Sequence, residues 1–173
     1  MNIISYRDKT PIVGNNPAIF NGSFIAGDVN IGEDSSIWFN SIIKGDVGFV
    51  RIGSKSNIQD MVFISSSIFK DTIFNVNIGD GVSVESKSTL RGCNIGDHCV
   101  IGLNTNIMDG VVIGENCIVI ANSFLPKFRK YPSNSLIAGS PAKAVRPIIK
   151  DELDYIINNA QLYVNLKNEY LQN

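Results

Sequence analysis

The sequence predicts an all-β solenoid: a single-stranded, left-handed parallel β-helix of hexapeptide repeats, followed by a C-terminal α-helix. Large aliphatic residues recur every six positions through most of the chain. A smaller residue follows most of them four positions later, and a glycine often follows directly. A period of six fits neither an amphipathic helix nor one long strand, but it fits short strands joined by tight turns, three to a coil.

The aliphatic series sets the expected interior of the solenoid. It runs in segments from Ile19 to Ile43, Ile52 to Ile64, Ile78 to Leu90 and Ile95 to Leu125. We expect these side chains to fill the interior and the smaller residues to fit the crowded corners. Two stretches break the rhythm, KGDVGFV at 44–50 and SSSIFKDTIFNVN at 65–77. They are expected to form outward loops, where sites are usually built.

The chain is expected to form one domain in three parts. Residues 1–128 are predicted as the β-helix, and 129–149 as a surface connector because they are rich in Pro, Ser and Gly. Residues 150–173 are predicted as a helix, because Asp151 and Glu152 suit a first turn and apolar residues follow at helical spacing. This stripe consists of Leu153, Ile156, Ile157, Ala160 and Val164. It is expected to pack on one face of the β-helix.

Composition narrows the classes of partner and compartment. The chain is 44% hydrophobic with a formal net charge of −1, which favours a soluble globular protein with no nucleic-acid or membrane partner. The start, MNIISYRDKTP, lacks the apolar core of a signal peptide, and no apolar stretch of about 18 residues spans a bilayer. Three cysteines without zinc-ribbon spacing favour reduced thiols and a cytoplasmic protein.

Several motifs resemble one known family. The motifs are GDVNIGEDSSIW, KGD, IGSKSNIQD, LRGCNIGDHCVIGLNTNIMDG and AGSPAKAVR, followed by the terminal helix. Together they are similar to the γ-class carbonic anhydrase-like proteins of the bacterial hexapeptide-transferase superfamily, from about Pro11 to the last helix. The resemblance implies a homotrimer that holds zinc or a related ion between subunits, through three histidines drawn from two chains.

The expected metal ligands are absent from this sequence. Ser65, Ser86 and Arg91 occupy the positions at which the resemblance implies histidines. A serine hydroxyl is a poor zinc ligand at neutral pH, and a guanidinium is a permanent cation that repels the ion. We therefore expect no metal, no cofactor and no zinc-bound hydroxide, and hence no carbonic anhydrase activity.

The resemblance also implies further residues of a cleft at the subunit boundary. Lys44 and Asp46 stand where it implies an arginine and an aspartate that pair between subunits, and lysine loses the bidentate fork. Gln59 and Tyr163 are implied to line the cleft, although without the metal they can equally hold the interface. The full candidate cleft is Lys44, Asp46, Asn57, Gln59, Asp60, Ser65, Ser86, Arg91 and Tyr163.

Arg91 brings a positive charge to the place where the resemblance implies a dication. An unpaired buried charge costs several kcal/mol, so the guanidinium needs a partner. Glu85 and Asp60 are candidate acids, and a small anion is the other possibility. We predict that Arg91 supplies the positive charge of a pocket at the subunit boundary, either closed by an acid or open to a small anion.

The remaining conspicuous residues are expected to be structural, and none is assigned a catalytic role. His98, which a hexapeptide acyltransferase would need as its general base, is expected in an exposed turn. Cys99 and Cys117 are 18 residues apart, one coil, and are expected to stack as buried thiols. Trp38 is expected to pack at the rim of the trimer.

Three functions remain open from the sequence. The leading one is a metal-free γ-carbonic anhydrase-like protein, a trimeric scaffold or small-ligand binder. The alternative is an acyl-CoA-dependent acetyltransferase, although the chain lacks a long loop to shape an acceptor pocket. The third keeps an enzyme with an oxygen-preferring metal bound by the carboxylates of Asp46 or Asp60.

Overall fold

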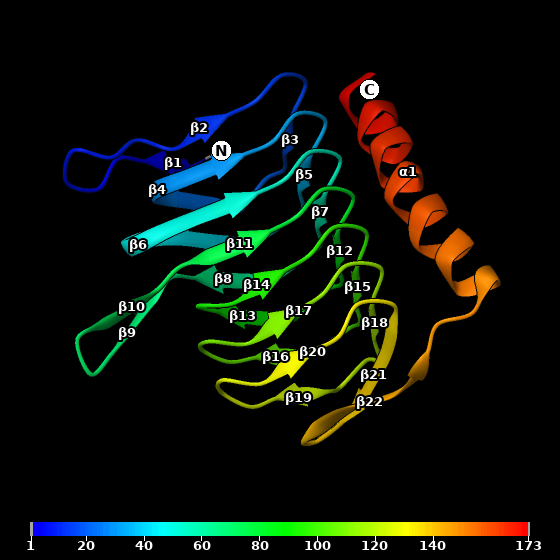
Figure 1. Ribbon diagram of the computed structural model, residues 1–173. Helices are drawn as coiled ribbons and strands as arrows, with labels where there is room; N and C mark the ends of the chain where they lie inside the picture. The colour runs from blue at the N-terminus through cyan, green and yellow to red at the C-terminus, as the bar shows by residue number, and fades with distance from the viewer. Residues whose placement is uncertain (1, 173) are drawn as a thin grey trace.

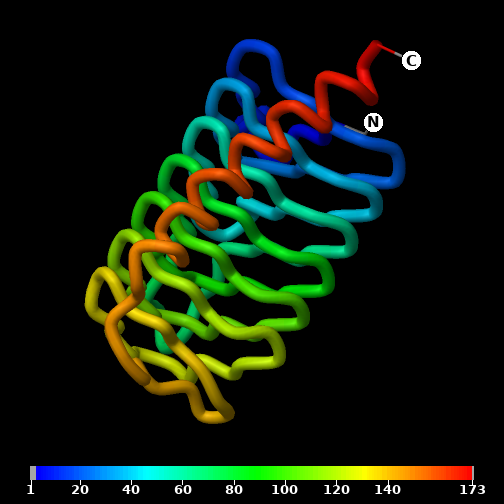
Figure 2. Tube along the Cα trace, turned by 90° about the vertical axis from the view of Figure 1, so that its right-hand side faces the viewer, coloured from blue at the N-terminus to red at the C-terminus, as the bar shows by residue number. Residues whose placement is uncertain are grey.

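The computed structural model describes residues 2–172 as a parallel β-helix with one helix lying along its length (Figures 1 and 2). Each coil contributes a strand to each of three faces, and strands of successive coils pair in parallel register. Ile64, for example, pairs with Ile43 of the coil before and Leu90 of the coil after. This stacking is the arrangement that the six-residue period predicts.

The strands fall into three faces, named here in the order in which the chain visits them. The first face contains the start of β4 (Phe24–Ile31) and of β6 (Ile42–Ile52), then β8 (Phe63–Ser65), β13 (Thr89–Arg91), β16 (Asn106–Ile107) and β19 (Phe124–Leu125). The second contains β2 (Ile12–Val13), the ends of β4 and β6, β11 (Val76–Ile78), β14 (Asn94–Ile95), β17 (Val112–Ile113) and β20 (Lys130–Tyr131). The third contains β3 (Ala18–Ile19), β5 (Ser36–Ile37), β7 (Asn57–Ile58), β12 (Ser83–Val84), β15 (Val100–Ile101), β18 (Ile118–Val119) and β21 (Ser135–Gly139). In addition, β1 (Asn2–Ile4) pairs with β4, and β22 (Ala142–Pro147) pairs antiparallel with β21.

The predicted interior is confirmed. From Ile25 to Leu125, every aliphatic residue of the series is at most 3% exposed, while Ile19 at the open end is only partly buried. Burying one such side chain contributes roughly 1.5–3 kcal/mol, so the stacked series supplies most of the hydrophobic stabilisation. The smaller residues fill the corners, where serine hydroxyls satisfy backbone carbonyls: Ser35 Oγ donates to Gly53 O at 2.7 Å.

The two interruptions behave differently. Residues 65–77 contain an antiparallel hairpin of β9 (Ser67–Phe69) and β10 (Thr72–Phe74), which projects on the side away from the helix (Figure 1). Residues 44–50 are not the expected loop, because β6 continues through them. Its neighbour β4 runs round the same corner, and Gly27 pairs with Gly45 there. A Cβ on Gly45 would lie 2.3 Å from Asp28 O, so glycine permits the close pairing.

The solenoid extends into the expected connector. Residues 129–149 contain β20, β21 and β22. Tyr131 and Ile137 continue the six-residue series beyond Leu125, and they are 6% and 0% exposed. The Pro, Ser and Gly residues of this segment lie at turns and do not interrupt the interior positions.

The helix α1 (Lys150–Gln172) packs on the third face, as expected. Ile156 is buried against Val100 and Ile118, and Ala160 is also buried. Ile157 is wrong as a core position, because it is 50% exposed.

Near its C-terminus, α1 is anchored by a lysine that the apolar pattern did not include. Lys167 is fully buried. Its Nζ donates to Asn16 O at 2.9 Å and to Asn168 Oδ1 at 3.0 Å, and lies 3.3 Å from Asp34 Oδ1. Three acceptors for three N–H donors explain how this cation is buried.

Candidate functional site

Strand register brings three of the candidate cleft residues together. Lys44 pairs with Ser65, and Ser65 pairs with Arg91, on the adjacent strands β6, β8 and β13. These residues lie where the first face turns into the second. We call this line, together with Lys127, the basic edge.

Arg91 has an acidic partner within the chain. Its Nε lies 3.6 Å from Oδ1 of Asp109, whose side chain is only 1% exposed. Neither expected acid, Glu85 or Asp60, forms this pair. The reason is the length of the coil, because Asp109 follows Arg91 by 18 residues and so lies one coil further along the solenoid.

Asp109 is shared by other groups besides Arg91. Lys127 Nζ lies 2.8 Å from Oδ2, and the Ser67 hydroxyl donates a hydrogen bond to Oδ1. Burial alone would raise the pKa of the Asp109 carboxyl, but Lys127, Ser67 and Arg91 outweigh burial and hold this pKa below its ordinary value. The carboxylate is therefore ionised at neutral pH, and two half-exposed cations share one negative charge.

The same cluster anchors the β9–β10 hairpin. Ser67 belongs to β9, and Lys127 Nζ lies 4.3 Å from the centre of the Phe69 ring. Phe74 of β10 packs against Phe128, with ring centroids 5.7 Å apart. Asp109 therefore fixes both the cations of the basic edge and the hairpin beside them.

Another set of candidates lies at the opposite edge of the first face, where the third face turns into it. Here Asp60 Oδ1 accepts the Phe39 amide at 3.2 Å, and Glu85 Oε2 accepts the Leu103 amide at 2.8 Å. Ser86 lies in the turn after Glu85. We call Asp60, Glu85 and Ser86 the acidic edge.

Tyr163 of α1 lies close to the acidic edge. Burial, with the nearby Asp60 and Glu85 carboxylates, raises the pKa of its phenol. The phenol therefore stays protonated at neutral pH, as a hydrogen-bond donor.

The other two residues of the NIQD element are buried in polar contacts of the third face. Gln59 Nε2 donates to Asn57 Oδ1 at 3.2 Å, and Asn57 Nδ2 donates to Ser83 Oγ at 2.8 Å. These bonds link neighbouring coils. Within one chain, Asn57 and Gln59 therefore lie on the side of Asp60 and do not reach Arg91.

The candidate cleft is thus divided between two edges of one chain. Lys44 and Asp46 pair with each other within the chain, with Nζ 2.7 Å from Oδ2. Ser65 and Arg91 are neighbours, whereas Ser86 lies at the other end of the segment that leads into β13. A site that uses both edges requires two chains.

Trp38 lies under the chain's own helix and not at an exposed rim. It is 4% exposed, stacks on Phe20 with ring centroids 4.5 Å apart, and meets Tyr163 edge-on at 5.4 Å. Its indole N–H donates to Ser36 Oγ at 3.0 Å. The apolar side chains of α1 cover this tryptophan without a second chain.

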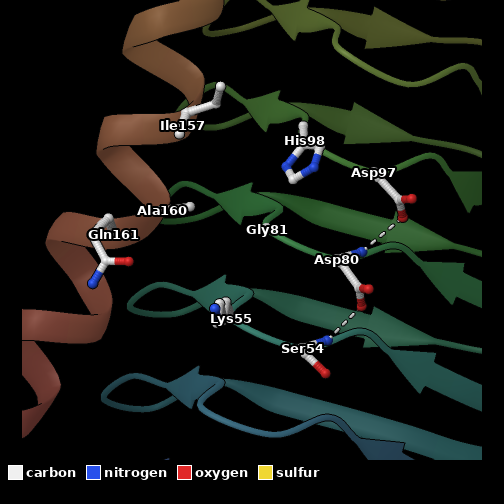
Figure 3. A pocket seen from close by; sticks show the side chains of 9 residues that line it. All are labelled: Ser54, Lys55, Asp80, Gly81, Asp97, His98, Ile157, Ala160 and Gln161. Carbon is white, nitrogen blue, oxygen red and sulfur yellow. Dashed lines mark hydrogen bonds between the residues drawn. The ribbon is translucent and has the colours of Figure 1, made fainter.

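His98 is exposed in a turn, as expected, and borders a pocket of about 480 Å³ beside α1 (Figure 3). The pocket is lined by Ser54, Lys55, Asp80, Gly81, Asp97 and His98 from the solenoid and by Ile157, Ala160 and Gln161 from α1. The nearby acids already hold the backbone: Asp97 Oδ1 accepts the Asp80 amide at 2.9 Å, and Asp80 Oδ1 accepts the Ser54 amide at 2.7 Å. None of the candidate cleft residues lines this pocket.

The three cysteines are buried free thiols, as expected. The Cys117 amide donates to Cys99 Sγ at 3.4 Å, which confirms that the two stack on successive coils. Burial, together with the Asp109 carboxylate, raises the pKa of Cys93 to about 12. A thiol that stays protonated is a poor nucleophile and a poor metal ligand.

The side chains present do not fit a zinc ion. Within residues 2–172, no three His, Cys, Asp or Glu side chains are grouped so that they could hold a metal. At the basic edge, the donors are a hydroxyl and a guanidinium already bound to Asp109. The same described residues contain no helix that is long and apolar enough to cross a membrane.

Three site residues were missed from the sequence: Asp109, Lys127 and Ser67. The spacing of one coil between Arg91 and Asp109 was the available signal. Lys127 and Ser67 lie outside the repeat, in a turn and in the hairpin, so no periodicity placed them near Asp109.

Comparisons with known proteins agree with this architecture. A sequence profile of the family described as "Hexapeptide repeat of succinyl-transferase" matches residues 93–127. A solved structure, a hexapeptide transferase family protein from Anaplasma phagocytophilum, matches with a TM-score of 0.92 and 29% identity over 98% of each chain. This match confirms the predicted left-handed hexapeptide β-helix.

Two curated relatives carry a functional name. The chain is 41% identical over 155 residues to "Probable carbonic anhydrase" of Methanocaldococcus jannaschii, covering 90% of this chain and 95% of that protein. It is 33% identical over 166 residues to "Gamma carbonic anhydrase 2, mitochondrial" of Arabidopsis thaliana, covering 95% of this chain. The chain spans 60% of the length of the Arabidopsis protein.

Proposed function

The chain belongs to the γ-carbonic anhydrase-like family of hexapeptide-repeat proteins, and on that basis we propose that it is a metal-free member, a trimeric scaffold without hydratase activity. One observation carries the proposal. Arg91, at a position where the family resemblance implies a metal-binding histidine, is held 3.6 Å from the buried Asp109 carboxylate. The positive charge that a metal would supply is supplied by a side chain.

The chemistry of Arg91 opposes the hydratase reaction. Zinc-dependent hydration uses a metal-bound water whose pKa is lowered to about 7. A guanidinium offers no open coordination position and does not lose its proton in proteins. Arg91 can bind and orient an anion, but it cannot generate hydroxide.

Assembly into a trimer is supported by the first face as well as by the resemblance. Phe24 and Ile42 are register partners on this face and are 41% and 38% exposed, and Phe124 on β19 is 38% exposed. An exposed apolar ladder flanked by two charged edges is typical of an interface between subunits. We keep the cytoplasm as the expected compartment.

The proposal is tested on the purified natural chain. We expect light scattering to give the mass of three chains at micromolar concentration, and carbon dioxide hydration to stay at the buffer rate with or without added zinc. Hydration that rises in proportion to protein concentration would contradict the proposal.

Acyl transfer is the second candidate function, favoured by the profile match over residues 93–127. The position of His98 opposes it. This histidine is exposed in a turn beside α1, and none of the residues printed as its pocket neighbours belongs to the basic edge. Calorimetric titration with acetyl-CoA and succinyl-CoA separates the two functions, because the scaffold is expected to bind neither.

A site for an oxygen-preferring metal is the third candidate. It would need Asp46 or Asp60, but Asp46 is paired with Lys44 at 2.7 Å and Asp60 lies at the opposite edge of the first face. We expect magnesium, manganese and calcium to leave the melting temperature unchanged. An increase that saturates at one ion per subunit would favour this candidate.

A further inference from the structure

The charges of the two edges are unequal and opposite. At the basic edge, Lys44 is neutralised by Asp46, while Arg91 and Lys127 share the single carboxylate of Asp109. One positive charge is left over. Arg91 and Lys127 are 40% and 36% exposed, so both can accept a further partner.

The acidic edge has the complementary excess. The carboxylates of Asp60 and Glu85 each accept one backbone amide. In the part of the chain that the structure describes, no lysine or arginine forms an ion pair with either acid, and Lys87 in the same turn is exposed. Two carboxylates therefore face solvent without a cation.

The two edges lie at the same height on the solenoid. Glu85 ends the β12 segment, and Arg91 ends β13, the next strand of the same coil. Asp60 and Ser65 stand in the same relation one coil earlier. When identical solenoids form a ring about an axis parallel to their own, each acidic edge meets the basic edge of the next copy at matching height.

From this juxtaposition, and resting on the trimer of the proposed function, we propose that Arg91 of one copy forms an ion pair with Glu85 and Asp60 of the next. The site is incomplete in one chain. Asp109 orients the guanidinium from below, and the neighbouring acids close it from the other side. The contact is heterologous, so repeating it closes a ring and leaves no edge unpaired.

Desolvation favours this pairing over an empty site. When the apolar ladder of Phe24 and Ile42 is covered, the adjacent Arg91 loses part of its water. A cation that is desolvated without sufficient counter-charge is destabilising, and planar guanidinium groups suit carboxylates. A small anion such as phosphate could supply the same charge, and the experiment below distinguishes the two.

The test is a charge-swap cycle on the full chain. The variants are Arg91→Glu, Glu85→Arg and the double variant, and trimer dissociation is measured by sedimentation equilibrium at about 0.15 M and 0.5 M salt. We expect each single variant to weaken assembly at least tenfold and the double variant to recover most of the loss. Glu115→Arg is the matched control, because Glu115 is exposed at another corner, and it is expected to assemble like the natural chain.

A milder pair keeps the test valid if the charge reversals misfold, which circular dichroism would reveal. Asp60→Asn combined with Glu85→Gln removes the charges with little change of shape. We expect this variant to dissociate several-fold more easily than the natural trimer, and its assembly to lose most of its salt dependence.

The outcomes separate the inference from the proposed function. A natural chain that trimerises, with charge-swap variants that assemble equally well, overturns the interchain ion pair and leaves the scaffold proposal intact. Phosphate that raises the melting temperature of the natural trimer but not of Arg91→Ala, with no effect of Glu85→Arg on assembly, assigns the site to a small anion and also overturns it. A natural chain that sediments as a monomer contradicts the proposed trimer itself.

Discussion

Arg91 and Asp109 face each other across one coil of the solenoid, with Nε of the guanidinium 3.6 Å from Oδ1 of the buried carboxylate. A repeat of about 18 residues turns this separation in sequence into contact. The relationship converts the position implied for a metal ligand into a fixed cation, and it makes Asp109 the residue on which the basic edge depends.

Replacing Asp109 tests that dependence. Asp109→Asn keeps the shape but leaves Arg91 and Lys127 without their shared charge and weakens the Ser67 bond. We expect a loss of about 1–3 kcal/mol in the free energy of unfolding, measured by urea denaturation. Lys127→Gln is the control and should cost less than about 1 kcal/mol, because Lys127 is partly exposed and its ion pair is screened. Equal stability of Asp109→Asn and the natural chain would show that the cluster is not structural.

Acid should weaken the same cluster. The pKa of Asp109 is lower in the folded chain than its unfolded value of about 3.9. Its stabilisation is therefore fully present above about pH 4 and is lost as the pH falls through the folded pKa. The melting temperature of the natural chain should approach that of Asp109→Asn below pH 4. A difference between the two that stays constant from pH 7 to about pH 3 would contradict this assignment.

Restoring histidines should create a zinc site. In Ser65→His/Ser86→His/Arg91→His, two imidazoles stand on register partners of one chain, and the third lies at the opposite edge of the first face. We expect about one zinc per subunit by elemental analysis, bound only while the protein is assembled. The matched variant Ser65→His/Ser86→His, which keeps Arg91, should bind no stoichiometric zinc, and zinc binding by this control would argue against Arg91 as the excluding charge.

The buried Lys167 should hold the C-terminal part of α1. Lys167→Met keeps the length of the side chain but leaves Asn16 O and Asp34 without the ammonium group. We expect faster amide hydrogen exchange over residues 163–172, with no change in the solenoid strands. Lys150→Met, at the exposed start of the helix, is the control. Unchanged exchange in Lys167→Met would mean that apolar packing alone holds this turn.

Most of the fold follows from periodicity in the sequence. Each interior aliphatic residue stands at a fixed spacing, and the structure buries the whole series from Ile25 to Leu125. Tyr131 and Ile137 obey the same spacing, but the Pro, Ser and Gly residues around them suggested a connector. The corner at Gly45 was mistaken for a loop, because the pairing of β4 with β6 depends on two facing glycines in different coils.

The candidate site was less predictable for a physical reason. Residues such as Ser65 and Arg91 lie in the repeat, so their register could be inferred. Lys127 reaches Asp109 from a turn, and Ser67 reaches it from the inserted hairpin, and neither position is set by the six-residue period. Contacts between subunits depend on surfaces that periodicity describes only in part.

The central claim is that a fixed guanidinium replaces the metal ion in this family member. Elemental analysis of the natural chain, purified without chelators and at known protein concentration, tests it most directly. We predict no stoichiometric zinc, iron or cobalt in the assembled protein. About one ion per subunit, retained through gel filtration, would contradict the account.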